Sequence, residues 1–150
     1  MQGNGAVCVA MMRCGEGGSV PWGMDASPPS SRSGFRGGGL RVQHEARELA
    51  RLTYAATGRF PPAERATLGD QMRRAAVSVA ANLAEGCGRA TRADRVRLLA
   101  IAWGSLRELE AHVDVAHAVG LLAPDRHAAV RTACRHTGRL LHALRTSPNF

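Results

Sequence analysis

The chain contains 150 residues, enough for one domain with a substantial core but too few to favour two. Only 4% of the residues are aromatic, so the core must rely on Leu, Val and Ala, and the four cysteines form no CxxC pair of the kind that zinc sites use. No apolar stretch approaches the length of a membrane span, and the net charge of +8, carried entirely by arginine, favours an anionic partner.

Residues 1–39 differ in composition from the rest, being rich in Gly, Pro and Ser, with the run SPPSSRSGFRGGG at 27–39. Such a segment buries too little apolar surface to offset the entropy lost on ordering, so we expect a disordered leader. Met24 offers an alternative start, and part of the leader is therefore expected to be untranslated. No basic region precedes the apolar run at 6–12, which argues against a secretory signal and for a cytoplasmic protein.

Residues 40–147 are expected to form one domain of four helices. The first covers about 42–57 and ends at Gly58 and the prolines that follow it. The second covers about 63–85, where apolar residues recur every three or four positions from Leu68 to Leu83. Gly86 and Gly88 are expected to stop this second helix.

The third helix is expected to begin at Thr91, which has the spacing of a capping box with Asp94, and to continue to about Gly120. Pro124 opens the fourth helix, which is expected to end near Arg145. Because short loops join these helices, successive helices should be antiparallel neighbours. The predicted fold class is all-α, an antiparallel up-down-up-down four-helix bundle.

The apolar arc of the third helix is wider than contact within one bundle requires. Beside its core stripe, Leu99 and Trp103 lie on one flank, and Ile101, Val115 and Val119 lie on the other. An arc of this width indicates a second partner surface, so we expect the bundle to self-associate. The alternative is a helix that its own neighbours cover.

The second and third helices also carry polar residues that an ordinary core does not require. They are Gln71, Arg73, Arg74, Ser78, Asn82, Glu85 and Gly86, followed by Gly104, Ser105, Glu108 and Glu110. This pattern, Q-x-R-R-A-x-x-S-x-x-x-N-x-A-E-G and then A-x-G-S-x-x-E-L-E, closely resembles the signature of the bacterial 23S rRNA intervening-sequence proteins. The resemblance covers about 40–145 and departs from the family at Gln43 and Arg95.

The resemblance implies a four-helix bundle that assembles into ring-shaped pentamers. It implies no particular activity, since no activity is established for most members of the family. A related branch serves as the accessory protein of retroelement reverse transcriptases, where a basic surface binds nucleic acid. The partners expected from the resemblance are therefore a second copy of the chain, RNA or DNA, and a reverse transcriptase.

Facing polar flanks on antiparallel helices favour a network of hydrogen bonds and ion pairs, for example Arg73 or Arg74 with Glu108 or Glu110. On this interpretation the signature residues are structural or form an oligomer interface. The alternative is that the same side chains contact a ligand or a nucleic acid directly.

The fourth helix gives the best independent indication of nucleic-acid binding. Its basic residues recur at helical spacing and form one stripe: Arg131, Arg135, Arg139, His142 and Arg145. Such a stripe can follow a phosphate backbone, and Arg89 and Arg92 are further candidates. Because no aromatic residue is interleaved, binding is expected to be weakly sequence-specific. The alternative is a solvated helix face on a protein-interaction module.

Two enzyme classes fit the sequence poorly. A di-metal carboxylate site needs Glu followed three residues later by His, which occurs nowhere here, so neither metal nor cofactor is predicted. A HEPN-type RNase spaces Arg and His as Arg131 and His136, or Arg107 and His112, are spaced, but Thr132 stands where that class has Asn, Asp or His. The RNase remains a remote alternative to the expected function, a non-catalytic RNA-binding accessory protein.

Overall fold

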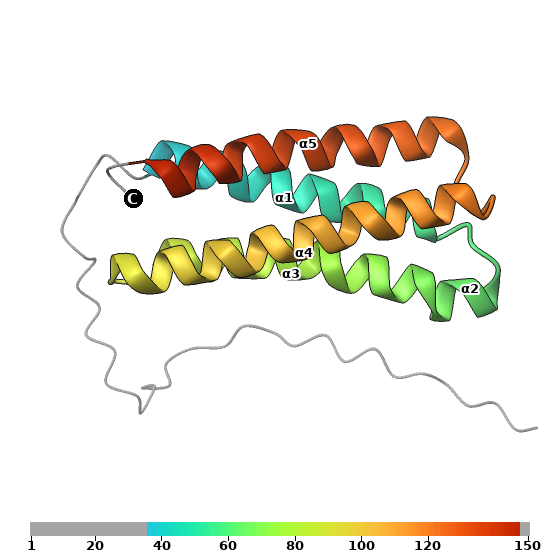
Figure 1. The fold of residues 1–150 in the computed structure, drawn as a ribbon, viewed down its shortest axis with the longest axis horizontal. Helices are drawn as coiled ribbons and strands as arrows, with labels where there is room; N and C mark the ends of the chain where they lie inside the picture. The colour runs from blue at the N-terminus through green and yellow to red at the C-terminus, as the bar shows by residue number, and fades with distance from the viewer. Residues whose placement is uncertain (1–35, 148–150) are drawn as a thin grey trace, which may run out of the picture. The chain divides into compact units, whose positions relative to one another are not determined.

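The computed structural model describes residues 36–147, and every regular element in that range is a helix. The elements are α1 (Arg36–Thr57), the short α2 (Pro62–Ala66), α3 (Leu68–Gly88), α4 (Arg92–Ala118) and α5 (Pro124–Thr146). The four long helices run in alternating directions along the chain (Figure 1). Both α1 and α4 pack against α3 and α5, which closes a four-helix bundle. The predicted fold class is confirmed.

The predicted leader lies outside the described residues over 1–35. Its last four residues, 36–39, instead form the first turn of α1. Gly39 is buried in that turn, so packing there outweighs the low helix propensity of glycine. The first helix therefore begins at Arg36, earlier than its predicted start at about residue 42.

The core is built mainly from aliphatic side chains, as the scarcity of aromatic residues predicts. The largest fully buried side chains within the bundle include Leu49, Met72, Leu99, Leu106 and Leu109. Leu99, which the sequence placed on a flank of the third helix, is thus a core residue. One half of the wide apolar arc on that helix serves the bundle itself.

The second predicted helix is divided in the structure at Thr67. The φ and ψ of this residue, −108° and −94°, are not helical. Its hydroxyl lies 3.2 Å from both the carbonyl oxygen of Ala63 and the carboxylate of Glu64, and such local bonding competes with a continuous helix. The apolar pattern gave no signal of the break because α2 buries no side chain.

The connection between α3 and α4 tests two predictions, the start of the third helix and the end of the second. Thr91 caps α4 as predicted, since its hydroxyl accepts a hydrogen bond from the N–H of Asp94 at 3.1 Å. Gly88 is the last residue of α3, as predicted, whereas Gly86 lies within the last turn and does not stop the helix. A Cβ at Gly86 would lie 3.3 Å from the Cβ of Leu98, so this glycine instead allows α4 to approach α3 closely.

Candidate nucleic-acid interface

The basic stripe predicted on the fourth helix lies along α5, and part of it faces α4. Arg135, Arg139 and His142 line one wall of a hollow of about 420 Å³. Trp103 and Arg107 of α4 line the other wall. Residues three or four positions apart share a helix face, so each helix presents its contribution to the hollow on a single side.

Gly138 lines the hollow between the two walls. A Cβ at this buried position would lie 3.3 Å from Cδ2 of Leu106 and 3.8 Å from Cζ3 of Trp103. The missing side chain therefore lets α5 approach α4 and leaves an edge of the indole uncovered.

Trp103 lies among cationic side chains at the margin of the core. The guanidinium carbons of Arg107 and Arg145 lie 4.9 Å and 5.9 Å from the centre of its ring, within the range of cation–π attraction. The ring of His142 is tilted by 52° to the indole at 6.4 Å between centroids. Trp103 was not among the candidate site residues predicted from the sequence, because this residue belongs to α4 whereas the basic stripe lies on α5. Its position beside the core stripe was the available signal.

The charges around this hollow have one sign. Its lining, as described, contains Arg107, Arg135 and Arg139 with His142, and no carboxylate. Three other hollows on the described surface each include at least one carboxylate. Arg135 and Arg139 on the α5 wall form no ion pair within residues 36–147, so they give the hollow a positive potential that attracts phosphate groups.

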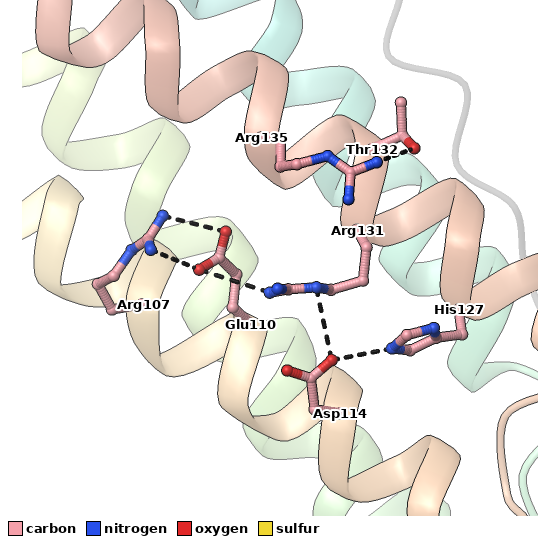
Figure 2. A network of polar contacts seen from close by, with 7 residues as sticks. All are labelled: Arg107, Glu110, Asp114, His127, Arg131, Thr132 and Arg135. Atoms are coloured by element: carbon pink, nitrogen blue, oxygen red, sulfur yellow. Dashed lines mark hydrogen bonds and ion pairs between the residues drawn. The ribbon is translucent and has the colours of Figure 1, made fainter.

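A buried carboxylate fixes the arginine on the α4 wall. Glu110 is only 7% exposed and pairs with both terminal nitrogens of Arg107, which lie 2.8 Å and 3.0 Å from its two oxygens. The guanidinium of Arg131 on α5 lies 3.5 Å from Glu110 (Figure 2). Because a bidentate pair restrains a guanidinium, Glu110 holds Arg107 beside Trp103 and also connects α4 to α5.

Arg131, a predicted nucleic-acid contact, lies in this network and not in the hollow. Its Nε is 3.4 Å from Oδ1 of Asp114, and Nε2 of His127 is 2.8 Å from the same oxygen (Figure 2). The His127 ring stacks on His117 with centroids 4.4 Å apart. Two carboxylates of α4 neutralise Arg131, which indicates a structural role for this residue in joining α5 to α4. Nucleic-acid contact by this residue stays a prediction.

The same network acts on a buried thiol of α5. Burial raises the pKa of Cys134 to about 12, and the negative charge of Glu110 adds to the increase. Because the thiolate is the reactive form of cysteine, Cys134 is an unreactive core side chain.

Arg89 and Arg92 lie at the connection between α3 and α4. Arg89 pairs with Glu85, and this hydrogen bond raises the pKa of the arginine. Neither arginine lines the α4–α5 hollow. The α3–α4 connection does lie at the same end of the bundle as the C-terminal end of α5, which carries Arg145 (Figure 1).

Several signature residues join neighbouring helices. The hydroxyl oxygens of Ser78 on α3 and Ser105 on α4 lie 2.8 Å apart, and Nδ2 of Asn82 donates to the Ser78 carbonyl at 2.8 Å. Nε of Arg73 donates to the Thr57 hydroxyl at 2.8 Å, which joins α3 to α1. These contacts agree with an architectural role for this part of the signature.

The example ion pairs predicted between the second and third helices are wrong. Arg74 pairs with Asp70 on its own helix at 3.3 Å, and Glu108 lies 3.5 Å from His112, also on its own helix. Glu110 faces α5 instead. The two-residue step from Glu108 to Glu110 turns about 200° around the helix, so the two acids lie on opposite sides of α4.

A second face of α4 points away from the bundle. Ile101, Val115 and Val119 are between 42% and 61% exposed. Gly104 has open space where a Cβ would stand, and Gln71 on α3 lines a separate hollow with Val115 and Val119. Of the two flanks predicted to form a partner surface, this one stays open.

The residue pairs spaced as in an RNase do not come together. Arg131 faces α4, whereas Nδ1 of His136 lies 3.2 Å from Glu45 on α1. Arg107 and His112 likewise contact different carboxylates. Within residues 36–147, no group of three His, Cys, Asp or Glu side chains is placed to hold a metal ion, and none of the helices found there has the length and apolar character to cross a membrane.

Comparison with known proteins gives a family and a fold. The family model of the 23S rRNA-intervening sequence protein matches residues 39–143. Among solved structures, the chain is similar to a protein of unknown function from the S23 ribosomal protein family of Bacteroides thetaiotaomicron, with a TM-score of 0.68 and 18% identity over 73% of this chain and 99% of that one. At that identity the likeness shows the fold alone. No curated protein matches the sequence.

Proposed function

Because the chain belongs to the 23S rRNA-intervening sequence protein family, we propose that it is a non-catalytic, RNA-binding accessory protein of the bacterial cytoplasm. The RNA backbone binds along the hollow between α4 and α5. Arg135 and Arg139 are the principal phosphate contacts, and Arg145 extends them toward the end of the bundle. Arg89 and Arg92 stay predicted contacts beyond it, and a reverse transcriptase stays a predicted partner.

One observation carries this proposal: Arg135 and Arg139 line the α5 wall of the hollow, opposite the indole of Trp103, and no carboxylate belongs to the lining as described. Within residues 36–147, Arg139 has no hydrogen-bond or ion-pair partner, and Arg135 is exposed and bonded only to the Thr132 hydroxyl at 2.9 Å. Arginines that no carboxylate neutralises retain their full attraction for phosphate. Arg131 pairs with two carboxylates on α4 and contributes to the site indirectly, by joining α5 to α4.

The salt dependence of RNA binding tests the proposed function. If Arg135, Arg139 and Arg145 each neutralise one phosphate of a single strand, the logarithm of the affinity should fall with slope about −2 against the logarithm of salt. Fluorescence anisotropy with a labelled single-stranded RNA should therefore show about a 20-fold loss of affinity between 50 and 200 mM salt. An absence of binding at 50 mM salt would contradict the proposal.

A specific observation favours a second candidate function, that of a self-assembling interaction module. Ile101 and Val115 on α4, with Val119 directly after its end, are exposed apolar side chains, and grouped exposure of this kind marks interaction surfaces. Val77 on α3 is also exposed. Gly104 allows a partner helix to approach the same side of α4 closely. We propose that a second copy of the chain binds here, in line with the pentamers that the family resemblance implies.

Light scattering after size exclusion tests this second function. The wild-type chain should elute as an oligomer, and Ile101→Asp with Val115→Asp should elute as a monomer, because two carboxylates would be buried without partners. Leu40→Asp is the matched control, since Leu40 is exposed on α1 and its replacement should leave the oligomer intact. A monomeric wild-type chain would exclude self-assembly through this face.

A further inference from the structure

We propose that the α4–α5 hollow takes an unpaired nucleobase stacked on the indole of Trp103, so that the protein selects single-stranded over double-stranded RNA. This inference rests on the proposed function, because it names the form of RNA that the same hollow accepts. It goes further than a basic surface, which would attract both forms through their phosphates.

Of the two arginines near Trp103, one is held in place by an ion pair and the other can be displaced by a base. Arg107 is held by two contacts to Glu110, so it stays beside the indole. Arg145 is exposed, lies farther from the ring at 5.9 Å, and is near the end of α5. An incoming base therefore displaces Arg145 from the indole, and the displaced guanidinium is then available to the phosphate beside that base.

The rest of the hollow suits the nucleotide that carries the base. Its volume of about 420 Å³ falls within the range of about 300–1,000 Å³ that is usual for small-ligand sites. Arg135 and Arg139 line the wall opposite the indole and can bind the flanking phosphates. Gly138 keeps the space between the walls open, because a side chain there would lie against Trp103.

Selection against a duplex follows from the geometry of stacking. In a duplex each base is covered by its neighbours on both faces, so no base face is free to stack on the indole, although the backbone still attracts the arginines. In a single strand a base can leave its neighbours and place its face on an aromatic side chain, which every kind of base can do. The hollow should therefore discriminate between strands while remaining tolerant of sequence.

Tryptophan fluorescence of the full chain tests the inference. The sequence contains only Trp22 and Trp103, so a Trp22→Phe background makes Trp103 the sole reporter. An unstructured RNA of about 12 nucleotides, within the usual site size, should quench this emission saturably, and a duplex of the same length should not. By anisotropy, Trp103→Leu should weaken binding of the single strand about tenfold with little change for the duplex, and Trp103→Phe should restore most of the affinity.

The outcomes separate this inference from the proposed function. If RNA binds with the expected salt dependence but neither quenches Trp103 nor responds to Trp103→Leu, the stacking site is excluded and the basic groove remains. If no RNA binds at 50 mM salt, both proposals fail together. If Trp103→Leu instead dissociates an oligomer of the chain, the hollow is an interface between copies, and the inference is overturned.

Discussion

Replacing Glu110 with alanine is expected to lower the free energy of unfolding by about 2–3 kcal/mol. This carboxylate is 7% exposed and contacts Arg107 on its own helix and Arg131 on α5. Removing one partner of a buried ion pair usually costs about 3–5 kcal/mol, because the other charge is left buried without compensation. The smaller value applies here since Arg107 is half exposed and Arg131 keeps its contact with Asp114.

Denaturant unfolding of the full chain at one fixed protein concentration measures this effect. The matched control is Glu108→Ala, the same substitution two positions earlier on α4, where the carboxylate is half exposed and lies 3.5 Å from His112. Because Glu108 is half exposed and its distance to His112 is long, this pair is expected to contribute at most about 1 kcal/mol. Equal unfolding midpoints for the two variants would show that Glu110 does not join α4 to α5 as described.

A more conservative change separates charge from shape at the same position. Glu110→Gln keeps the length of the side chain and can still accept a hydrogen bond from Arg107, so it should cost less than alanine. The two variants together therefore divide the contribution of the carboxylate between its charge and its packing.

Helical periodicity was enough to predict the bundle. The apolar residues of 68–83 recur at helical spacing, and the loops between the helices are short, so the antiparallel arrangement follows from pattern alone. The break at Thr67 could not be predicted in this way, because it depends on hydrogen bonds of one hydroxyl in a segment that buries nothing. The role of Gly86 could not be predicted for a related reason: it allows a close contact with Leu98 on another helix, which the sequence does not reveal.

The candidate site was predicted only in part, because pairing across helices is invisible in the sequence. Spacing placed Arg135 and Arg139 on one stripe, but it gave no sign that Arg131 in the same stripe pairs with Glu110 and Asp114. These residues differ in the direction they face around α5, which the rotation of the helix within the bundle decides. The contribution of Trp103 to the hollow depends on the same rotation of α4.

Reversing the charge of Arg135 and Arg139 together is expected to reduce the affinity for single-stranded RNA about 100-fold at 50 mM salt. The double variant Arg135→Glu with Arg139→Glu removes two of the three proposed phosphate contacts and adds repulsion between carboxylates and phosphates. The slope of affinity against salt should become shallower by about 1.4, because each lost contact with a single strand removes about 0.7. Both side chains are exposed, so the fold should be unaffected.

A control with the same change in total charge is available outside the hollow. Arg47 on α1 and Arg59 after its end are both exposed, and neither lines the hollow. Arg47→Glu with Arg59→Glu should reduce RNA affinity only a few-fold, because neither side chain lines the hollow and salt screens the interaction of exposed charges outside it with the RNA.

Anisotropy titrations of these two double variants side by side therefore test most directly whether RNA binds between α4 and α5. The structure leads us to expect about a 100-fold loss of affinity and a shallow salt dependence for the variant in the hollow, with near wild-type binding for its control. Equal affinities of the two variants for RNA would contradict the proposed interface.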